Sequence, residues 1–370
     1  MRIVWLSDLD FRVSGYFNIS ISLCKGLAAL GHEVKIAGLG YKGEQHDFPF
    51  SIIPIQNFQE AIACIANLYK TWKFDVLVVA LDIPMQEQFL HALEGKPFKY
   101  VGIMPIEADP LCMSWAGALL EMDKRLIISE FGVEEAKKVG ISATYLPVGI
   151  DTDLWRMPSK EERTALRNSL GFNKDTFAIL TVADNQERKN LSKAFEIMSE
   201  FVKGKPNVKY MLVTREHCPV GWKLRDMALM YGINNNLMIF ERGMGFKELR
   251  ALYAVSDCFL LPSKTEGLGM PLMEAMSVGV PCIATNATGM RELLSDGRGK
   301  LVDYDYVYVD CFGNGNRYYM DKNDAVCQLE YLYSHSGQRM INKARKYVEN
   351  RSWDKAISTL NLELMDVIKT

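Results

Sequence analysis

The sequence predicts an α/β fold with parallel sheets, divided between two domains. Short apolar runs rich in β-branched residues recur along the chain, for example "DVLVVAL" and "AILTVAD", and they lack a clean apolar–polar alternation. Helical patterns separate most of these runs, which is typical of parallel sheets covered on both faces. A chain of 370 residues is long enough for two domains. The polar segment "VGIDTDLWRMPSKEER", at about 148–163, marks the break between them.

The elements follow in regular order along the chain. The first half has strand-like runs at "RIVWLS", "EVKIAG", "SIIPI", "YVGIMP", "RLIISE" and "ATYLPV", with helical patterns at 16–30, 57–72, 112–123 and 131–139. The second half has further strand-like runs at "VKYMLVT", "LMIFER", "DCFLLP", "CIAT" and "GKLVD". The tail 321–368 is helical in pattern with a break at "NRSW", and the aromatic stretch 303–320 is expected to be a loop packed against these helices. The pattern therefore predicts two Rossmann-like domains that face each other.

Composition excludes several classes of protein. The chain has 43 Lys and Arg against 45 Asp and Glu, so it lacks the basic excess of a dedicated nucleic-acid binder. No apolar run is long enough to span a bilayer, and the chain enters a strand at once, so we expect no signal peptide. The eight cysteines are scattered without a CxxC pair. This favours free thiols in a reducing cytoplasm over a disulfide framework or a metal cage.

The stretch "SKTEGLGMPLMEAMSVGVP" is the most informative part of the sequence. It follows a buried strand, and in open parallel sheets ligands bind beyond the carboxyl ends of strands. Pro271 suits the first helical position and Gly279 suits a helix end, so we expect a helix of about two turns. The N–H groups at the start of such a helix can bind phosphate. With Glu266 on the preceding loop and Glu274 in the first helical turn to accept sugar hydroxyls, the stretch predicts a nucleotide-sugar site.

The same stretch, read as "PSKTEGLGMPLMEAMSVGVPCIAT", resembles the E-x7-E signature of family 4 retaining glycosyltransferases, which have the GT-B fold. The segments "GHEVKIAGLG", "VGIDTDLW", "NQERKNLSKAF" and "ELRALYAVSDCFLLPS" are also similar to that family, so the resemblance covers most of the chain. It implies an acceptor-binding domain at 1–160 and a donor-binding domain at 161–351, with a cleft between them. The tail "SWDKAISTLNLELMDVI" resembles the family's last helix, so residues 352–370 are expected to pack back on the first domain.

The resemblance also assigns roles to residues of the second domain. It implies that Glu274 binds the donor ribose and that Glu266 contacts the transferred sugar. Lys189 matches the family's lysine for the leaving diphosphate. The usual arginine position falls on Asp184 or Asn185, which leaves the neighbouring Arg188 as the candidate to replace it. The other expected donor-binding residues are Asn185, Gly267, Leu268, Gly269, Met270, Gly289 and Met290.

In the first domain the resemblance points to two loops. Ser14 and Gly15 follow the first strand, where the family has a glycine loop near the acceptor or the donor phosphate. Glu107 and Asp109 follow the strand "YVGIMP" and are candidates for acceptor recognition, with an ordinary loop as an equal alternative. The "DLD" at 8–10 invites a metal site of the DxD type, but DxD belongs to a different, single-domain glycosyltransferase fold. We therefore expect no metal and no other cofactor.

These expectations combine into one mechanism and two alternatives. A sugar would pass from a nucleoside-diphosphate sugar to a hydroxyl of a glycan, glycolipid or small molecule by front-face attack with retention. Lys189, Arg188 and helix-end N–H groups would stabilise the leaving diphosphate, with Glu266 on the sugar. The alternatives are a catalytically silent nucleotide-sugar-binding partner or sensor, and a GT-B-like sugar-nucleotide epimerase. We expect a cytoplasmic protein with at most peripheral contact at the inner membrane face; the base, sugar, acceptor and oligomeric state stay open.

Overall fold

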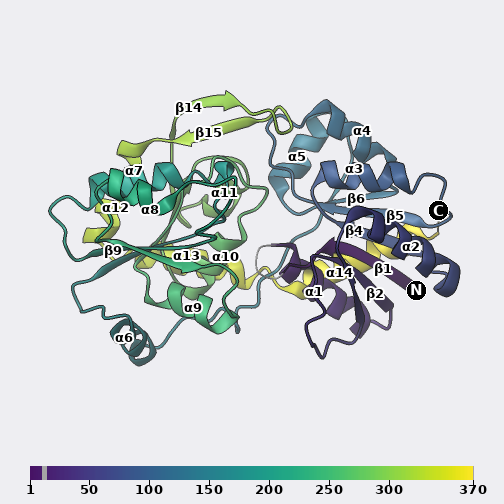
Figure 1. Ribbon diagram of the computed structural model, residues 1–370, viewed down its shortest axis with the longest axis horizontal. Coiled ribbons are helices and arrows are strands. Elements are labelled where there is room, and N and C mark those ends of the chain that lie inside the picture. The colour runs from purple at the N-terminus through teal and green to yellow at the C-terminus, as the bar shows by residue number, and fades with distance from the viewer. Residues whose placement is uncertain (11–14, 370) are drawn as a thin grey trace. The chain divides into compact units, whose positions relative to one another are not determined.

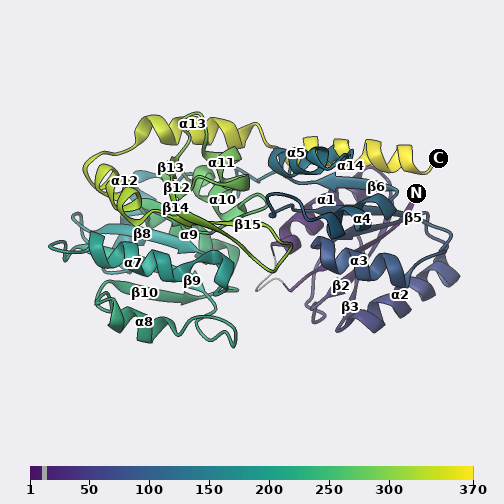
Figure 2. The same ribbon diagram turned by 90° about the horizontal axis from the view of Figure 1, so that it is seen from above.

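The computed structural model describes residues 1–10 and 15–369, which form two compact units (Figures 1 and 2). Unit 1 comprises Met1–Gly149, Cys311–Gly315 and Arg351–Thr370, and unit 2 comprises Ile150–Asp310 and Asn316–Asn350. The first change of unit, between Gly149 and Ile150, lies within the predicted break at 148–163 and before the domain boundary expected at 160. The short segment 311–315 is an addition to unit 1 that the sequence did not indicate.

Unit 1 is built on a seven-stranded parallel sheet with the strand order β3-β2-β1-β4-β5-β6-β7. The strands are β1 (Arg2–Asp8), β2 (Glu33–Leu39), β3 (Ser51–Ile55), β4 (Val76–Ala80), β5 (Lys99–Met104), β6 (Lys124–Ile127) and β7 (Thr144–Tyr145). The helices are α1 (Tyr16–Ala29), α2 (Phe58–Trp72), α3 (Ile83–Ala92), α4 (Met113–Glu121), α5 (Glu130–Lys138) and α14 (Trp353–Val367). All five residues of β4 are buried, as expected for a strand covered on both faces.

The last helix, α14, packs against α1 within unit 1. A side chain at Gly26 of α1 would overlap Ile357 of α14, so the glycine permits this close approach. Farther along α14, Lys124 donates a 2.6 Å hydrogen bond to Asp366. The last helix is thereby fixed to the first part of the chain.

Unit 2 is built on a six-stranded parallel sheet with the order β10-β9-β8-β11-β12-β13. The strands are β8 (Phe177–Val182), β9 (Val208–Thr214), β10 (Leu237–Glu241), β11 (Cys258–Leu261), β12 (Cys282–Thr285) and β13 (Lys300–Val302). The helices are α6 (Lys160–Ser169), α7 (Leu191–Phe201), α8 (Leu224–Met230), α9 (Phe246–Val255), α10 (Met270–Val278), α11 (Thr288–Leu294), α12 (Lys322–Ser334) and α13 (Gln338–Glu349). The strand order reverses between β8 and β11, and such a switch point is where ligands bind in open sheets.

The aromatic stretch forms a β-hairpin, so the expectation of a loop was wrong. Its strands, β14 (Tyr304–Val309) and β15 (Asn316–Met320), pair with each other as a separate antiparallel sheet. Tyr306 stacks on Tyr319 across the strands at 4.7 Å between ring centroids, and such cross-strand pairs stabilise a hairpin. Figure 1 shows the hairpin next to α7. The alternating pattern in "YDYVYV" was the available sign of a strand.

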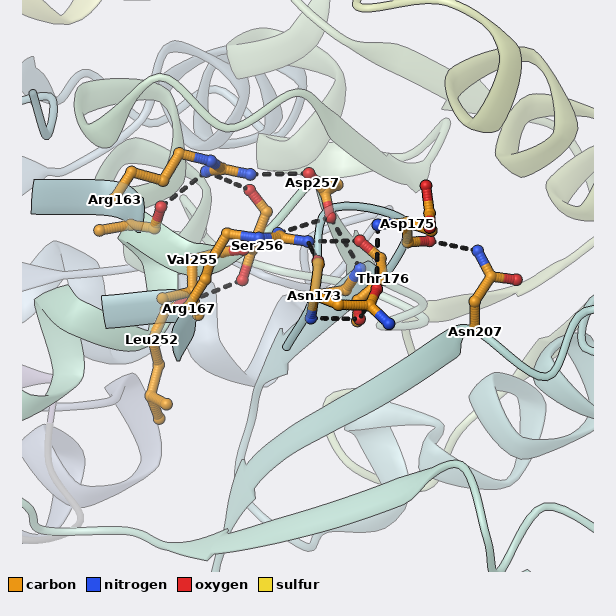
Figure 3. Close-up of polar contacts among 12 residues, drawn as sticks. Arg163, Arg167, Asn173, Asp175, Thr176, Asn207, Leu252, Val255, Ser256 and Asp257 are labelled. Carbon is orange, nitrogen blue, oxygen red and sulfur yellow. Dashed lines mark hydrogen bonds and ion pairs between the residues drawn. The ribbon is translucent and has the colours of Figure 1, made fainter. Parts of the chain in front are cut away.

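At the amino ends of β8 and β11, a carboxylate joins α6 to the sheet (Figure 3). Asp257 accepts hydrogen bonds from Arg163 at 2.6 Å, from Arg167 at 3.0 Å and from the N–H of Ala178 at 2.8 Å. The two arginines also donate hydrogen bonds to three backbone carbonyls. Two of these belong to the last residues of α9, Ala254 and Val255, and the third belongs to Ser256, which follows the helix. We call Asp257, Arg163 and Arg167 the amino-edge cluster.

Among the described residues, no helix is long and apolar enough to cross a membrane. The eight cysteines are free thiols, and three of them are buried.

Candidate functional site

The signature segment forms the loop after β11 and then α10. Gly269, with φ of 99°, precedes the helix; Pro271 is its second residue, and Gly279, with φ of 82°, ends it. Both glycines adopt a left-handed conformation that other residues enter at a cost. The short predicted helix is confirmed. The placing of Glu274 in the first turn was wrong, because the helix begins at Met270 and Glu274 is its fifth residue.

Glu266 is buried between two cations from the turn after β8. Its Oε1 accepts a 2.6 Å hydrogen bond from Lys189 Nζ, and its Oε2 accepts a 2.9 Å bond from Arg188 Nη1. Burial alone would raise the pKa of Glu266, but the charges of Lys189 and Arg188 outweigh it and lower that pKa to about 2. Glu266 is therefore ionised at neutral pH. We call Glu266, Arg188 and Lys189 the carboxyl-edge cluster.

The turn that carries the two cations, Glu187–Lys189, is hydrogen-bonded to the loop after β11. Lys264 donates its backbone N–H to the carbonyl of Arg188 at 2.9 Å, and the Arg188 guanidinium donates to the carbonyl of Thr265 at 2.8 Å. Asn190, with φ of 54°, ends the turn and donates its side-chain amide to the carbonyl of Pro262. These bonds set the position of the cations relative to Glu266.

Glu274 has a different environment from Glu266. It is buried, and its Oε2 accepts a 2.7 Å hydrogen bond from the hydroxyl of Tyr253. Burial raises the pKa of Glu274 to about 7, although the Tyr253 bond and the charge of Arg242 act in the opposite direction. Both the neutral and the ionised form of Glu274 are therefore populated near neutral pH.

The start of α11 lies against the signature loop. Thr288 accepts the N–H of Glu266 at 3.0 Å, and Gly289 donates its N–H to the carbonyl of Glu266 at 3.1 Å. A side chain at Gly289 would come within 2.7 Å of the carbonyl oxygen of Gly267, so only glycine permits this approach without a shift. The helix start is thereby held next to the carboxyl-edge cluster.

Three residues expected at the donor site use their side chains for packing or for loop structure. Leu268 and Met290 are buried in the core of unit 2. Asn185 donates its side-chain amide to the carbonyl of Trp222 and accepts the N–H of Trp222, both at 2.9 Å. Its side chain therefore holds the loop before α8. Any contact of Leu268 or Met290 with a phosphate or a sugar would come from their backbone groups.

Two arginines at the same edge of the sheet were not singled out from the sequence. Arg215 and Arg242 each follow a strand directly, β9 and β10 respectively. Arg215 Nε donates a 2.7 Å hydrogen bond to Asp184 after β8, and Arg242 Nη1 lies 3.7 Å from the same carboxylate. Their positions were the signal that could have identified them, because Arg215 directly follows the predicted strand "VKYMLVT" and Arg242 is the last residue of the predicted strand "LMIFER".

Unit 1 also brings polar side chains to the carboxyl edge of its sheet. Tyr16, at the start of α1, donates a 2.6 Å hydrogen bond to Asp82, which follows β4. Burial raises the pKa of Tyr16 well above its usual value, and Asp82, Glu107 and Asp8 raise it further. Glu107 therefore lies close enough to act on a side chain at this edge. Tyr16 and Asp82 were not predicted.

The remaining residues expected in unit 1 are placed as follows. Gly15 directly precedes α1, whereas Ser14 lies outside the described residues. Asp109 follows β5 and raises the pKa of Lys138 through its charge, a smaller effect than the direct hydrogen bond from Lys138 to Glu135. Asp10 donates its backbone N–H to Asp8 at 3.1 Å. Within the described part of the chain, no three His, Cys, Asp or Glu residues are grouped to hold a metal ion.

Part of unit 2 is similar to a known protein family. Residues 162–305 match the family described as "Glycosyl transferases group 1". This part of the chain is therefore similar to the group 1 glycosyltransferases. The matched residues include β8, the turn with the two cations, and the whole signature segment.

Curated relatives share this glycosyltransferase region. The chain is 29% identical to a GDP-mannose-dependent alpha-(1-6)-phosphatidylinositol monomannoside mannosyltransferase of Mycolicibacterium smegmatis, over 43% of this chain and 42% of that protein. It is 27% identical to the alpha-monoglucosyldiacylglycerol synthase of Acholeplasma laidlawii, over 43% and 39%. The chain thus spans about two fifths of the length of these curated relatives.

Solved structures match the chain over its full length. The sucrose-phosphate synthase of Thermosynechococcus elongatus has a TM-score of 0.80 at 13% identity and covers 100% of both chains. A glycosyltransferase from Rickettsia africae ESF-5 has a TM-score of 0.77 at 17% identity. Anabaena HepE, solved with UDP-glucose, has a TM-score of 0.74 at 16% identity. Each of these matches covers 100% of this chain and 99% of the other chain. At these identities the likeness shows the fold, which is the GT-B fold that the signature implied.

Proposed function

We propose that this protein is a retaining glycosyltransferase that moves a sugar from a nucleoside-diphosphate sugar to a hydroxyl acceptor. The carboxyl-edge cluster is the observation that carries the proposal. It joins one carboxylate to two cations at a strand-order switch point, just before the short helix α10. Surplus positive charge near a helix start suits a diphosphate.

In the proposed donor complex, each polar group has a separate partner. Glu274 accepts hydrogen bonds from the ribose hydroxyls, and Glu266 accepts them from the transferred sugar. The backbone N–H groups of Gly269 and Met270 bind phosphate or sugar oxygens. Lys189 and Arg188 meet the phosphate next to the sugar. Arg242 lies near enough to Glu274 to lower its pKa, so it is a further candidate for the nucleotide side.

The proposed reaction is a front-face substitution. The acceptor oxygen bonds to the anomeric carbon on the side from which the diphosphate leaves, and the sugar–phosphate bond breaks. The acceptor proton passes to an oxygen of the leaving phosphate, while Lys189 and Arg188 stabilise the negative charge that builds there. With its pKa lowered to about 2, Glu266 is a poor proton acceptor, which supports the phosphate as the base.

We propose that the reaction needs no metal ion, because two side-chain cations already serve the leaving group. Transfer should therefore survive EDTA. Complete loss of activity that Mg²⁺ or Mn²⁺ restores would instead point to Asp8 and Asp10. The free thiols also support a reducing compartment such as the cytoplasm.

For the acceptor, we propose that unit 1 supplies the binding groups. Tyr16, Asp82 and Glu107 can bind hydroxyl groups, and this suits a polyol or glycan. The named relatives act on phosphatidylinositol mannoside and produce glycosyldiacylglycerol, which favours a glycolipid within this class.

A thermal-shift panel of UDP, GDP, ADP and their sugars tests the donor part first. A ligand at about 100 times its Kd should stabilise the fold by about 2.7 kcal/mol. The stabilising donor is then incubated with acceptor extracts, and NMR reports the anomeric configuration of the product. Inversion would exclude the retaining mechanism, and donor binding without any product would favour a silent binding partner. Conversion of the donor sugar without acceptor would identify an epimerase.

A further inference from the structure

The β14–β15 hairpin contacts two lysines that are almost completely buried. The side chain of Lys264 is 3% exposed, and its Nζ lies 4.9 Å from the ring centroid of Tyr319 and 5.1 Å from that of Tyr308. Lys193 Nζ lies 4.8 Å from the centroid of the same Tyr319 ring. Buried ammonium groups are costly unless they find partners, and the faces of tyrosine rings supply part of the compensation. The hairpin is thus built around these two charges.

Lys264 also connects the hairpin to the turn that carries the catalytic cations. Its Nζ donates to the Glu187 carboxylate and to the hydroxyl of Tyr308, the latter at 2.8 Å. Tyr308 in turn donates a 3.0 Å hydrogen bond to Glu187. Tyr308, Lys264 and Glu187 therefore form a closed triangle of polar contacts, which we call the hairpin clamp.

The backbone of Lys264 also connects the hairpin to the turn Glu187–Lys189. Its N–H donates to the carbonyl of Arg188, and its carbonyl accepts the N–H of Tyr318 in β15 at 3.1 Å. Glu187 directly precedes Arg188 and Lys189, and Lys264 lies two residues before Glu266. The clamp thus joins both segments that meet in the carboxyl-edge cluster.

We propose that the hairpin clamp is a positioning device, which holds the turn Glu187–Lys189 so that Arg188 and Lys189 face the leaving phosphate. The inference rests on the proposed function. Tyr308, Lys264 and Glu187 are positioning residues, since they act through the turn and touch no reacting atom. Small displacements of groups that stabilise a transition state reduce the rate more than they reduce binding.

Tyr308→Phe tests the clamp with little change in packing, because it keeps the ring and removes the hydroxyl. We expect kcat to fall about tenfold with donor KM nearly unchanged, together with a modest fall in Tm, because the hydroxyl bonds to both Lys264 and Glu187. The matched control is Tyr304→Phe. Tyr304 lies on the same strand and its ring packs on Tyr318, so loss of its hydroxyl should leave kcat unchanged.

Lys264→Met separates positioning from stability. It replaces a buried charge with an apolar side chain of similar length, and Glu187, which is 59% exposed, can turn to water. Such replacements are often neutral or stabilising, so we expect an unchanged or higher Tm together with a lower kcat. A variant that loses stability but keeps its kcat would show a purely structural lysine and overturn the proposal.

Hydrogen exchange measures how well the backbone N–H groups of the turn are protected, and it does not depend on enzyme activity. The N–H of Lys189 donates to the carbonyl of Gln186, and that of Asn190 to the carbonyl of Glu187. Both should exchange faster in Tyr308→Phe than in the parent or in Tyr304→Phe. Unchanged exchange, or faster exchange with an unchanged kcat, overturns the proposal. If the parent transfers no sugar at all, the proposed function fails, and the exchange experiment still decides whether the clamp holds the turn.

Discussion

The two ends of the strand pair β8 and β11 carry similar groups of charges with different consequences. At the amino ends, Asp257 lies between Arg163 and Arg167; at the carboxyl ends, Glu266 lies between Arg188 and Lys189. Each cluster has one carboxylate and two cations. The number of charges therefore does not distinguish a structural contact from a binding site.

The two clusters differ in which ends of the neighbouring helices lie next to them. The amino-edge cluster donates to carbonyls at the end of α9, where the helix dipole is negative, so its surplus positive charge is compensated within the fold. The carboxyl-edge cluster lies beside the start of α11, and its Glu266 lies four residues before the first residue of α10; the helix dipoles are positive at both starts. There the surplus charge is reinforced, and an anionic ligand is favoured.

Removing the central carboxylate from each cluster should give the largest contrast. Glu266→Ala removes a buried carboxylate from two partly buried cations, which typically costs about 3–5 kcal/mol of stability, and it also removes the proposed contact to the sugar. Replacing Asp257 by alanine should cost less, because its side chain is 25% exposed against 9% for Glu266 and is therefore less desolvated. We expect Asp257→Ala to retain the kcat of its folded fraction and Glu266→Ala to lose transfer. Urea unfolding and kcat per folded enzyme are the measurements, and equal kcat losses would remove the distinction between the clusters.

Removing one cation from each cluster should give the next largest contrast. Lys189→Ala should lower kcat by on the order of 10²–10³ with a smaller change in donor KM, because the charge it stabilises builds up only as the sugar–phosphate bond breaks. Arg188 is adjacent and shares Glu266, so the double variant should be worse than either single variant. Arg163→Ala at the amino edge is the control and should affect stability alone. A Lys189→Ala enzyme with normal kcat and raised KM would make the lysine a binding residue only.

Glu274→Ala should have a moderate effect, confined to nucleotide binding. The ribose would lose a charged hydrogen-bond acceptor, typically worth about 1.5–3 kcal/mol, so the Kd for nucleoside diphosphate should rise by roughly one to two orders of magnitude. Isothermal titration calorimetry measures this change. Binding as tight as in the parent would exclude the ribose role.

The sequence predicted those features of the site that depend on neighbouring residues, and it did not predict those that join residues far apart in the chain. The helix α10 was predictable because Pro271 and Gly279 act on their own neighbourhood. The pairing of Glu266 with Lys189 was not, since it joins residues 77 positions apart that only the sheet order brings together. The hairpin was missed because its tyrosines resemble ordinary packing residues until the buried Lys264 and Lys193 are placed between them.

The smallest expected effect is the pH dependence that separates Glu274 from Glu266. Burial raises the pKa of Glu274 to about 7, whereas the two cations lower that of Glu266 to about 2 against the opposing effect of burial. Of the two glutamates, only Glu274 then changes charge between pH 6 and pH 8. If the ionised form binds ribose, affinity for nucleoside diphosphate should rise on the order of tenfold over this range. Calorimetry at pH 6, 7 and 8 measures it.

Glu274→Gln supplies the control for that experiment and a second readout. The phosphate of the nucleotide also titrates near pH 6, but it does so equally in parent and variant, so the difference between them isolates Glu274.

In the free protein the raised pKa of Glu274 favours its neutral form. Its contribution to stability is therefore complete below the ordinary glutamate pKa of 4.5 and is lost as the pH rises through about 7. Glu266, with its lowered pKa, contributes above pH 4.5 and loses that contribution as the pH falls toward 2. Glu274→Gln should thus flatten both the binding curve and the stability curve between pH 4.5 and 8, whereas a binding curve that keeps its slope would assign the titration to another group.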